Sequence, residues 1–238
     1  MNETAQKALE AYGGKTLWSS AKHIEAEVSV DGWAFTLKRR PFFRHAHISM
    51  QVASPFARLT PIGKNAQVSG VLEQADVYLE DQEGRILDAR QDARDYFPGG
   101  RRLFVWDDLD MAYFANYAFW NYFTFPMLLL NADIIWQETG ENCLQATFPD
   151  AIPTHSRVQS FYFDLDNGRL LQHNYTTEVI GGFAKAAHVI AAHHENGGVS
   201  FPSRRIVTPR GIGGKPLKWP VLIEIDVHHF EVKSQSRR

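Results

Sequence analysis

The chain has 238 residues, 44% of them hydrophobic and 22% charged, which is the composition of a globular protein rather than a disordered one. Its 25 basic and 27 acidic residues give a formal net charge of −2, so no basic excess indicates nucleic acid or an anionic membrane as a partner. A single cysteine, Cys143, excludes an internal disulfide and a multi-cysteine metal site. Cys143 lies in an apolar segment and is interpreted as a small buried hydrophobic residue.

The N-terminal residues predict a helix. Residues 3–12 favour helix and are followed by Gly13-Gly14, a common helix C-terminus, and a second helical turn is expected over residues 16–21. This polar segment lacks the apolar stretch and the cleavage site of a secretory signal, so a cytoplasmic protein is predicted.

From residue 23 onward, apolar and polar residues alternate as they do in half-buried strands. Residues 23–30 predict a strand, Asp31-Gly32 a tight turn, and residues 33–38 the returning strand of a hairpin. Further strands are expected over residues 43–52, 57–61, 67–72, 77–80 and 85–89. Their short, regular spacing predicts an antiparallel meander rather than βαβ units. Residues 91–102 are polar and loop-like, with Pro98-Gly99-Gly100 interrupting them.

The second half of the chain repeats this pattern. Strands are expected over residues 134–138, 142–148, 157–165, 169–179, 185–194, 203–209 and 221–232. Thr139-Gly140 and Asp166-Asn167-Gly168 predict two of the turns between them. Residues 185–194 are rich in alanine and would favour a helix on propensity alone, but the strands on both sides favour a strand. We find no repeat, no low-complexity segment and no linker, so residues 1–238 are expected to form a single domain.

One stretch differs from all others: residues 106–130, WDDLDMAYFANYAFWNYFTFPMLLL, carry no charge after Asp110. Asp107 or Asp108 is predicted to cap a helix here, and Pro126 to end or kink it near Phe125. A helix that is apolar on nearly every side is buried, in a protein core or in lipid. Scattered tyrosines and asparagines, together with the proline, favour the core over a membrane span.

The predicted fold class is therefore mainly β (α+β). A curved antiparallel half-barrel sheet is wrapped around a central aromatic helix, with a short helix at the N-terminus. Tyr113, Tyr117 and Trp120 form one stripe of the central helix and are predicted to line a ligand cavity, because such rings combine apolar surface with hydrogen-bonding tips. Trp33 and Phe35, on the strand expected over residues 33–38, are assigned to the same cavity. The alternative is that the stripe packs against the sheet as ordinary core.

Histidines provide the candidates for catalysis. His188, on the strand expected over residues 185–194, stands among small apolar residues and can act as a general acid or base near neutral pH. Tyr175 and Arg204 are candidates to orient a polar group of the substrate, and His155 lies in a loop that can point into the cavity mouth. The alternative interpretation of His188 is a hydrogen-bonded core histidine.

A metal site is a weaker hypothesis. His45 and His47 are two residues apart on a predicted strand and therefore point to the same face, which suits two metal ligands. No carboxylate follows at a recognisable spacing. The Asp107-Asp108-Asp110 cluster is explained more simply by helix capping, and no motif of a nucleotide or metalloprotease site occurs. No cofactor is therefore predicted.

Several motifs resemble those of a group of bacterial proteins of unknown function. They are AYGG at the end of the first helix, WDDLD before the aromatic helix, PTHSRVQSFYFDLDNGRLLQHNYT and GGVSFPSRRIV. That group in turn resembles the lipoprotein-carrier (LolA/LolB-like) fold. The resemblance implies a half-open antiparallel barrel whose mouth is plugged by helices around a hydrophobic cavity.

The predicted function is binding of a small hydrophobic or aromatic molecule between the sheet and the buried helix. One alternative is a cofactor-independent enzyme, such as a lyase, isomerase or cyclase, that uses a cavity histidine as general acid or base. A weaker alternative is a histidine-ligated metalloenzyme. No nucleic-acid partner and no membrane span are expected, and the oligomeric state stays open.

Overall fold

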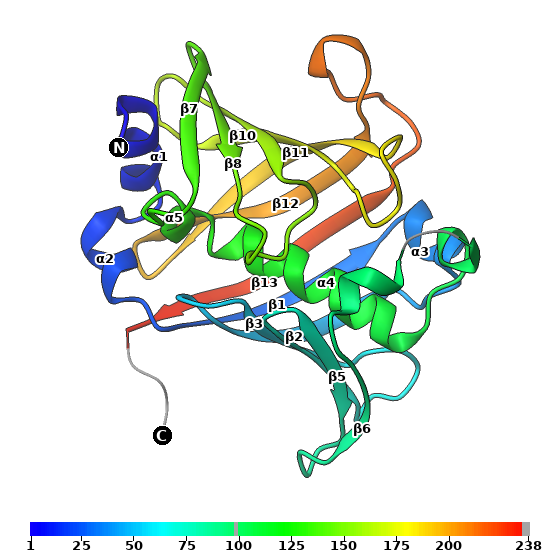
Figure 1. The fold of residues 1–238 in the computed structure, drawn as a ribbon. Helices are drawn as coiled ribbons and strands as arrows, with labels where there is room; N and C mark the ends of the chain where they lie inside the picture. Colours follow the sequence, from blue (N-terminus) through cyan, green and yellow to red (C-terminus); the bar gives the residue numbers. More distant parts are fainter. Residues whose placement is uncertain (98–99, 235–238) are drawn as a thin grey trace.

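A computed structural model describes residues 1–97 and 100–234, without the side chain of Arg101. The predicted loop residues Pro98 and Gly99 lie outside this range. Thirteen strands form one antiparallel sheet in the order β6-β5-β4-β3-β2-β1-β13-β12-β11-β10-β9-β8-β7 (Figure 1). The strands are β1 (His23–Asp31), β2 (Phe43–Gln51), β3 (Phe56–Thr60), β4 (Ser69–Glu73), β5 (Asp76–Glu80), β6 (Ile86–Arg90), β7 (Ile135–Gly140), β8 (Cys143–Thr147), β9 (Val158–Phe163), β10 (Leu170–Thr176), β11 (Lys185–Asn196), β12 (Val199–Pro209) and β13 (Ile223–Lys233).

The sheet is curved and does not close, because among the described residues neither β6 nor β7 has a partner strand on its outer side. Five α-helices accompany it among the described residues: α1 (Glu3–Ala11), α2 (Gly14–Ser20), α3 (Trp33–Lys38), α4 (Asp108–Phe123) and α5 (Phe125–Leu128). Three 3₁₀ turns lie at Ala93–Tyr96, Gly100–Leu103 and Ile212–Gly214. The predicted half-barrel with a central helix and a short N-terminal helix is confirmed. The strand predicted over residues 185–194 is also confirmed, as β11.

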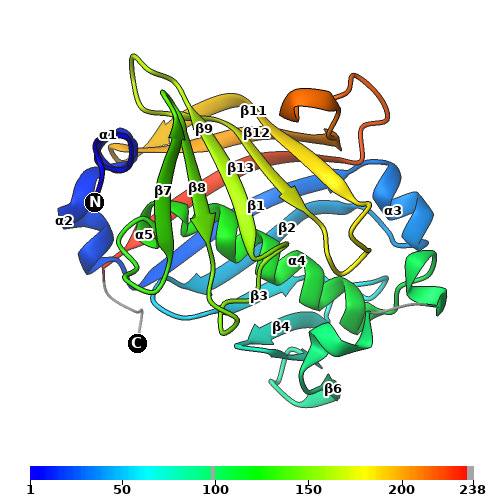
Figure 2. The same cartoon turned by 45° about the horizontal axis from the view of Figure 1, so that its top comes forward.

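The first strand holds the two halves of the sheet together. β1 pairs with β2 on one side and with β13 on the other, so the meander β1–β6 and the meander β7–β13 meet along it. Figure 2 shows α4 lying across the concave side of this curved sheet. No described helix is long and apolar enough to cross a membrane.

One predicted strand is wrong, because residues 33–38 form helix α3. Gly32, with φ of +124°, turns the chain sharply after β1. Trp33 and Ala34 then donate their backbone N–H groups to the carbonyl oxygens of Val221 and Leu222, at 3.1 and 2.9 Å. The free donors of the first helical turn are thus satisfied by the segment that leads into β13, so a helix is stable here without a capping side chain.

The start and the end of α4 are as predicted. The Asp107 side chain accepts a hydrogen bond from the Asp110 N–H at 2.8 Å, and the Asp110 carboxylate accepts one from the Asp107 N–H at 3.1 Å. This reciprocal arrangement satisfies two donors at the helix N-terminus. The helix ends at Phe123, and Pro126 lies in the first turn of α5. Asp110 is fully buried between Arg90 and Arg102, at 2.6 and 2.8 Å, so the aspartate cluster anchors the helix.

The side of α4 that faces β3–β5 is packed tightly. Gly70 on β4 lies so close to Ala112 that an added Cβ would come within 2.5 Å of the alanine Cβ. The glycine carbonyl also accepts a hydrogen bond from Asn116 Nδ2 at 2.9 Å. Glycine is therefore required at this point of β4, and the helix is fixed in position over the sheet.

β-Bulges interrupt the alternation of β13 and β11 at two pairs of adjacent histidines, His228-His229 and His193-His194. His228 is an extra residue in the pairing of β13 with β1, and both His228 and His229 are exposed. In β11 a similar irregularity accompanies His193, which is hydrogen-bonded through Nε2 to the Tyr12 hydroxyl at 3.0 Å. Bulges shift the face of all later side chains, and alternation alone does not reveal them. The turn predicted at Thr139-Gly140 lies two residues later, because β7 extends to Gly140.

Candidate ligand-binding site

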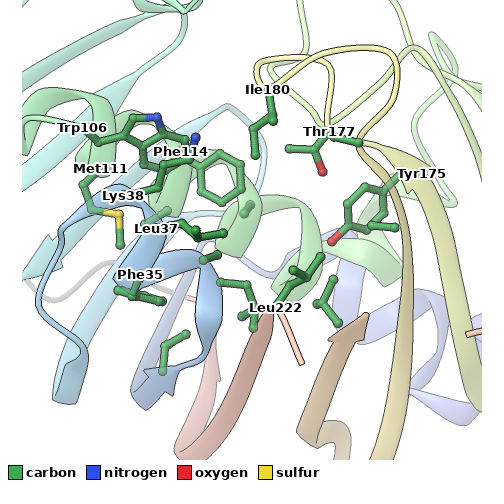
Figure 3. A pocket seen from close by; sticks show the side chains of 18 of the residues that line it. Phe35, Leu37, Lys38, Trp106, Met111, Phe114, Tyr175, Thr177, Ile180 and Leu222 are labelled. Carbon is green, nitrogen blue, oxygen red and sulfur yellow. The ribbon is translucent and has the colours of Figure 1, made fainter. Parts of the chain in front are cut away.

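A cavity of about 450 Å³ lies between α4, α3 and the concave side of strands from both halves of the sheet. Figure 3 shows its labelled walls: Tyr175, Thr177 and Ile180 face Phe35, Leu37 and Lys38 across the open space. The sheet contributes side chains from β1, β2, β10, β11, β12 and β13, namely Val30, Phe43, Tyr175, Lys185, Ala186, Val207, Pro209, Ile223 and Ile225.

The helical wall is formed by one face of α4. Its residues are spaced three or four apart, as one face of a helix requires, and are Met111, Phe114, Ala115, Ala118, Phe119 and Tyr122. This face differs from the predicted one, which carries Tyr113, Tyr117 and Trp120. Tyr117 is fully buried, and Trp120 donates from Nε1 to the Gln51 carbonyl oxygen at 2.8 Å. Tyr117 and Trp120 therefore pack as core, because the Tyr117 hydroxyl and the Trp120 indole N–H find partners in the protein.

Of the other residues assigned to the cavity, only Phe35 lines it. Phe35 lines it from α3, while Trp33 is 51% exposed and meets Trp219 edge-on, with ring centroids 6.0 Å apart. Tyr113 lines a separate polar groove of about 560 Å³ together with Arg94. Trp33 and Phe35 would share one face of a strand, because side chains two positions apart do so. In helix α3 side chains share a face only when they are three or four positions apart, so Trp33 and Phe35 point in different directions.

Few polar groups reach the cavity. Those with a polar side-chain atom are Lys38, Trp106, Tyr122, Tyr175, Thr177 and Lys185, and no acidic residue and no histidine is among the described lining residues. The volume is within the range of about 300–1,000 Å³ that is typical of ligand pockets. The cavity thus suits a largely apolar molecule with one or two hydrogen-bonding groups.

Lys38 is a buried cation on the wall formed by α3. Its Nζ donates to the carbonyl oxygens of Arg102 and Leu103, at 3.0 and 2.5 Å, and lies 4.9 Å from the centre of the Trp106 ring. Burial lowers the pKa of Lys38 to about 8, with the Asp110 carboxylate opposing the shift. These contacts tie the segment before α4 to α3, and so complete one wall of the cavity.

A chain of hydrogen bonds leads from the cavity wall into the protein. The hydroxyls of Tyr175 and Tyr122 are 3.0 Å apart, and the Tyr122 hydroxyl is 2.7 Å from His155 Nε2. The other ring nitrogen of His155 is hydrogen-bonded to the Tyr117 hydroxyl at 3.1 Å. Burial lowers the pKa of His155 to about 3 and raises the pKa of Tyr122 and Tyr175. All of these groups are therefore neutral at pH 7.

His188 lies behind the cavity wall rather than on it. It is fully buried, with its ring edge-on to that of Tyr122 at 4.6 Å between centroids. Neither ring nitrogen has a hydrogen-bond partner among the described residues. Burial holds the pKa of His188 well below its ordinary value, and the Arg205 cation adds to the shift. The neutral His188 ring packs against the Tyr122 ring, on the side away from the cavity.

The arginine in this cluster is Arg205, whereas Arg204 was the arginine expected from the sequence. Arg204 lies on the outer face, where its Nε donates to Glu224 Oε1 at 2.9 Å. Arg205 is 1% exposed, donates to the Tyr122 carbonyl oxygen at 3.3 Å, and lies 5.1 Å from the Tyr122 ring centre. Burial lowers the pKa of Arg205 to about 10. Arg205 and the apolar residue Val207 are two positions apart on β12 and therefore share a face of the sheet. This alternation could have identified Arg205 as the buried member of the Arg204-Arg205 pair.

The histidine pair on β2 is on the outer face of the sheet. His45 Nδ1 is 2.5 Å from Glu27 Oε1, and His47 Nε2 is 3.0 Å from Glu25 Oε2, so each ring has its own carboxylate. Among the described residues no group of three histidine, cysteine or acidic side chains could hold a metal ion. The two residues do share a face, as predicted, but it is the face opposite to the cavity.

Similarity to known proteins is confined to the fold. No protein-family profile matches the sequence, and no curated protein is significantly similar to it. Among solved structures, a LolA superfamily protein from Nitrosomonas europaea is 9% identical, with a TM-score of 0.51 over 97% of this chain and 92% of that one. A putative outer membrane lipoprotein-sorting protein domain from Vibrio parahaemolyticus is 10% identical, with a TM-score of 0.52 over 99% and 93%. The chain therefore has a LolA-like fold, as the sequence resemblance implied.

Proposed function

We propose that this protein binds a small hydrophobic or aromatic molecule in the cavity between α4, α3 and the sheet. The observation that carries the proposal is the apolar wall around about 450 Å³ of space inside the fold. A ligand that buried roughly 300 Å² of apolar surface there would gain about 7 kcal/mol before the cost of association. The LolA-like fold, shared with a protein described as lipoprotein-sorting, supports an apolar ligand.

The hydroxyls of Tyr122 and Tyr175 define where a polar group of the ligand would lie. Both line the cavity, and both have a raised pKa, so at neutral pH they offer hydrogen bonds rather than negative charge. Thr177 adds a third hydroxyl on the same side (Figure 3). A carbonyl or hydroxyl group at one end of an apolar molecule would match these three hydroxyls.

A direct test combines ligand identification with a blocked cavity. Protein purified without added ligand is extracted into organic solvent for mass spectrometry, and the neutral probe N-phenyl-1-naphthylamine is titrated by fluorescence. Ala118 is buried on the cavity wall, so Ala118→Trp should fill the space and weaken probe binding at least about tenfold. The matched control is Ala191→Trp, because Ala191 is exposed on β11 and outside the cavity lining.

Circular dichroism and thermal melting show whether Ala118→Trp keeps the fold. Phe119→Ala, which enlarges the same wall, provides a second variant and should shift probe selectivity towards larger molecules. Equal probe affinity in the wild type and in both wall variants would place the probe outside the cavity and remove the main support for the proposal.

A cofactor-independent lyase, isomerase or cyclase is the second candidate, and the hydrogen-bonded chain Tyr175–Tyr122–His155 favours it. In that function, Tyr175 would give its hydroxyl proton to one position of the ligand and take a proton back from another, while Tyr122, itself held by His155, keeps the Tyr175 hydroxyl in place. The raised pKa of both tyrosines makes such transfer costly, so binding is the better-supported function. Conversion of the extracted ligand by wild-type protein but not by Tyr175→Phe would establish the enzyme.

A further inference from the structure

The cavity opens at an end of the molecule that carries many exposed apolar side chains. Three of the lining residues are themselves largely exposed, Leu37 at 53%, Phe104 at 65% and Phe183 at 75%. Figures 1 and 2 both place α3, the segment before α4, the β10–β11 turn and the long β12–β13 connection at this end. That connection adds further exposed apolar residues, namely Ile212 (98%), Leu217 (46%) and Trp219 (69%).

The same end is strongly basic. The four segments that surround the opening are residues 32–44, 100–106, 179–185 and 209–223, and we call them the rim. The rim contains ten lysine and arginine residues and no aspartate or glutamate. The remainder of the chain therefore holds 15 of the 25 basic residues and all 27 acidic ones. A net charge of −2 hides this separation of charge along the molecule.

About half of the rim cations are not neutralised by the protein itself. Arg40, Arg44 and Arg102 form ion pairs with aspartates outside the rim. In the part of the chain that the structure describes, five further rim cations have no ion pair: Arg39, Lys185, Arg210, Lys215 and Lys218. These side chains stand beside the exposed apolar residues, so positive charge and apolar surface share one end.

We propose that the rim docks onto an anionic lipid bilayer, with the cavity opening towards the membrane. Apolar side chains such as Ile212 and Phe183 would enter the boundary between headgroups and acyl chains, and the lysines would contact the lipid phosphates. Trp33 and Trp219, packed edge-on at 6.0 Å, would lie at the headgroup level, where tryptophan is favoured. A ligand of the proposed kind could then pass between bilayer and cavity without crossing water.

Other occupants match only one of the two features. A nucleic acid or an acidic protein surface would pair with the cations but leave apolar side chains as exposed as Ile212, at 98%, in water. A second copy of the chain would cover the apolar side chains but bring two basic rims together, which is unfavourable. A bilayer with anionic headgroups satisfies the charge and the apolar surface together.

The experiment is co-flotation with vesicles of phosphatidylcholine alone and of phosphatidylcholine mixed with phosphatidylglycerol. The wild-type protein should float with the mixed vesicles and much less with the neutral ones. The double variant Lys215→Glu/Lys218→Glu should weaken binding roughly tenfold or more, because each basic residue near an anionic surface contributes a several-fold factor. Ile212→Ser/Phe183→Ser should weaken it as well, and its remaining binding should be lost in about 1 M NaCl, where the Debye length is about 3 Å.

Matched controls lie at the opposite end of the molecule. Lys15 and Lys22 are exposed in and after α2, so Lys15→Glu/Lys22→Glu changes the net charge equally and should leave flotation unchanged. Ile135, 59% exposed on the edge strand β7, provides Ile135→Ser as the apolar control. Equal flotation of the rim and control variants, or a dimer that forms through the rim with no vesicle binding, would overturn the proposal. Probe binding in solution reports separately on the proposed cavity function in the lysine variants and in Ile135→Ser, because none of these residues lines the cavity.

Discussion

His155 and His188 show how neighbouring buried histidines can differ. His155 is hydrogen-bonded at both ring nitrogens by tyrosine hydroxyls, whereas His188 has no partner at either nitrogen among the described residues. A buried polar atom without a partner costs roughly 1–3 kcal/mol, and a satisfied one costs little. The sequence could identify both residues as candidates for chemistry, but not which of them the fold satisfies, because the partners come from distant segments.

This contrast predicts opposite effects of the same substitution. His188→Leu removes two unpaired nitrogens and should stabilise the protein by about 1–2 kcal/mol at pH 7.5. His155→Leu leaves the Tyr117 hydroxyl without its partner and removes one of the two partners of the Tyr122 hydroxyl, so it should destabilise the protein by about 2–3 kcal/mol. Urea denaturation followed by fluorescence measures both changes. A loss of stability in His188→Leu would mean that the ring is hydrogen-bonded to something besides the protein, such as water or ligand.

Stability should fall with acid because of the buried histidines. Burial lowers the pKa of His155 to about 3, and the pKa values of His173 and His188 are also well below 6.5. The folded state therefore keeps these rings neutral, while the unfolded state takes up protons as the pH falls below about 6.5. Their stabilisation is complete above that pH and is lost progressively as the pH falls toward the folded pKa values.

The size of this effect can be counted in protons. Near pH 5, each of the three rings should lower the free energy of unfolding by about 1.4 kcal/mol for each unit by which the pH falls. Urea denaturation between pH 4.5 and 6 gives the slope, and His188→Leu should reduce it by about one proton. An unchanged slope in the variant would show that His188 is already protonated in the folded state.

At the scale of elements, the sequence predicted most strands and the capped aromatic helix, because alternation and capping are local signals. It failed where the decisive partner was remote. Residues 33–38 become helix α3 because Val221 and Leu222 supply acceptors for its first turn. The cavity was assigned to the wrong face of α4 for the same reason, since Gly70 and Gln51 accept hydrogen bonds on the packed side.

Gly32 allows α3 to form this wall, and a matched glycine isolates its role. A Cβ at Gly32 would lie 2.4 Å from the Leu222 carbonyl oxygen, whereas Gly84, also with positive φ, has nothing within 4 Å. Gly84→Ala should cost about 1 kcal/mol for its backbone conformation alone. Gly32→Ala should cost about 3 kcal/mol or more, because backbone must also move, and should weaken probe binding in the cavity.

Chemical denaturation and the fluorescence titration measure both consequences. Equal costs for Gly32→Ala and Gly84→Ala would show that α3 can shift away from β13 freely. In that event, Phe35 and Lys38 would not hold the cavity wall in the way that the contacts of α3 indicate.

For the whole molecule, amino-acid composition gives no sign of an anionic partner, whereas the folded chain carries a basic surface at one end. The sums of 25 basic and 27 acidic residues indicate no affinity for anionic surfaces. Folding gathers the four rim segments, which are far apart in the sequence, at one end. Only the three-dimensional arrangement joins the residues around the cavity opening into a basic surface, so total charge could not predict it.

Charge separation alone should therefore be measurable without lipid. Although the protein has a net charge of −2 at pH 7, it should be retained on a cation-exchange resin at pH 7.5 in low salt, because the rim presents its cations together. Lys215→Glu/Lys218→Glu should elute at clearly lower salt than Lys15→Glu/Lys22→Glu, although both variants have the same net charge. Identical elution of the two would mean that the resin senses only total charge, and the rim would then not act as a distinct basic surface. Retention that survives in Ile212→Ser/Phe183→Ser would separate the electrostatic part of docking from the apolar part, because those substitutions leave every rim cation in place.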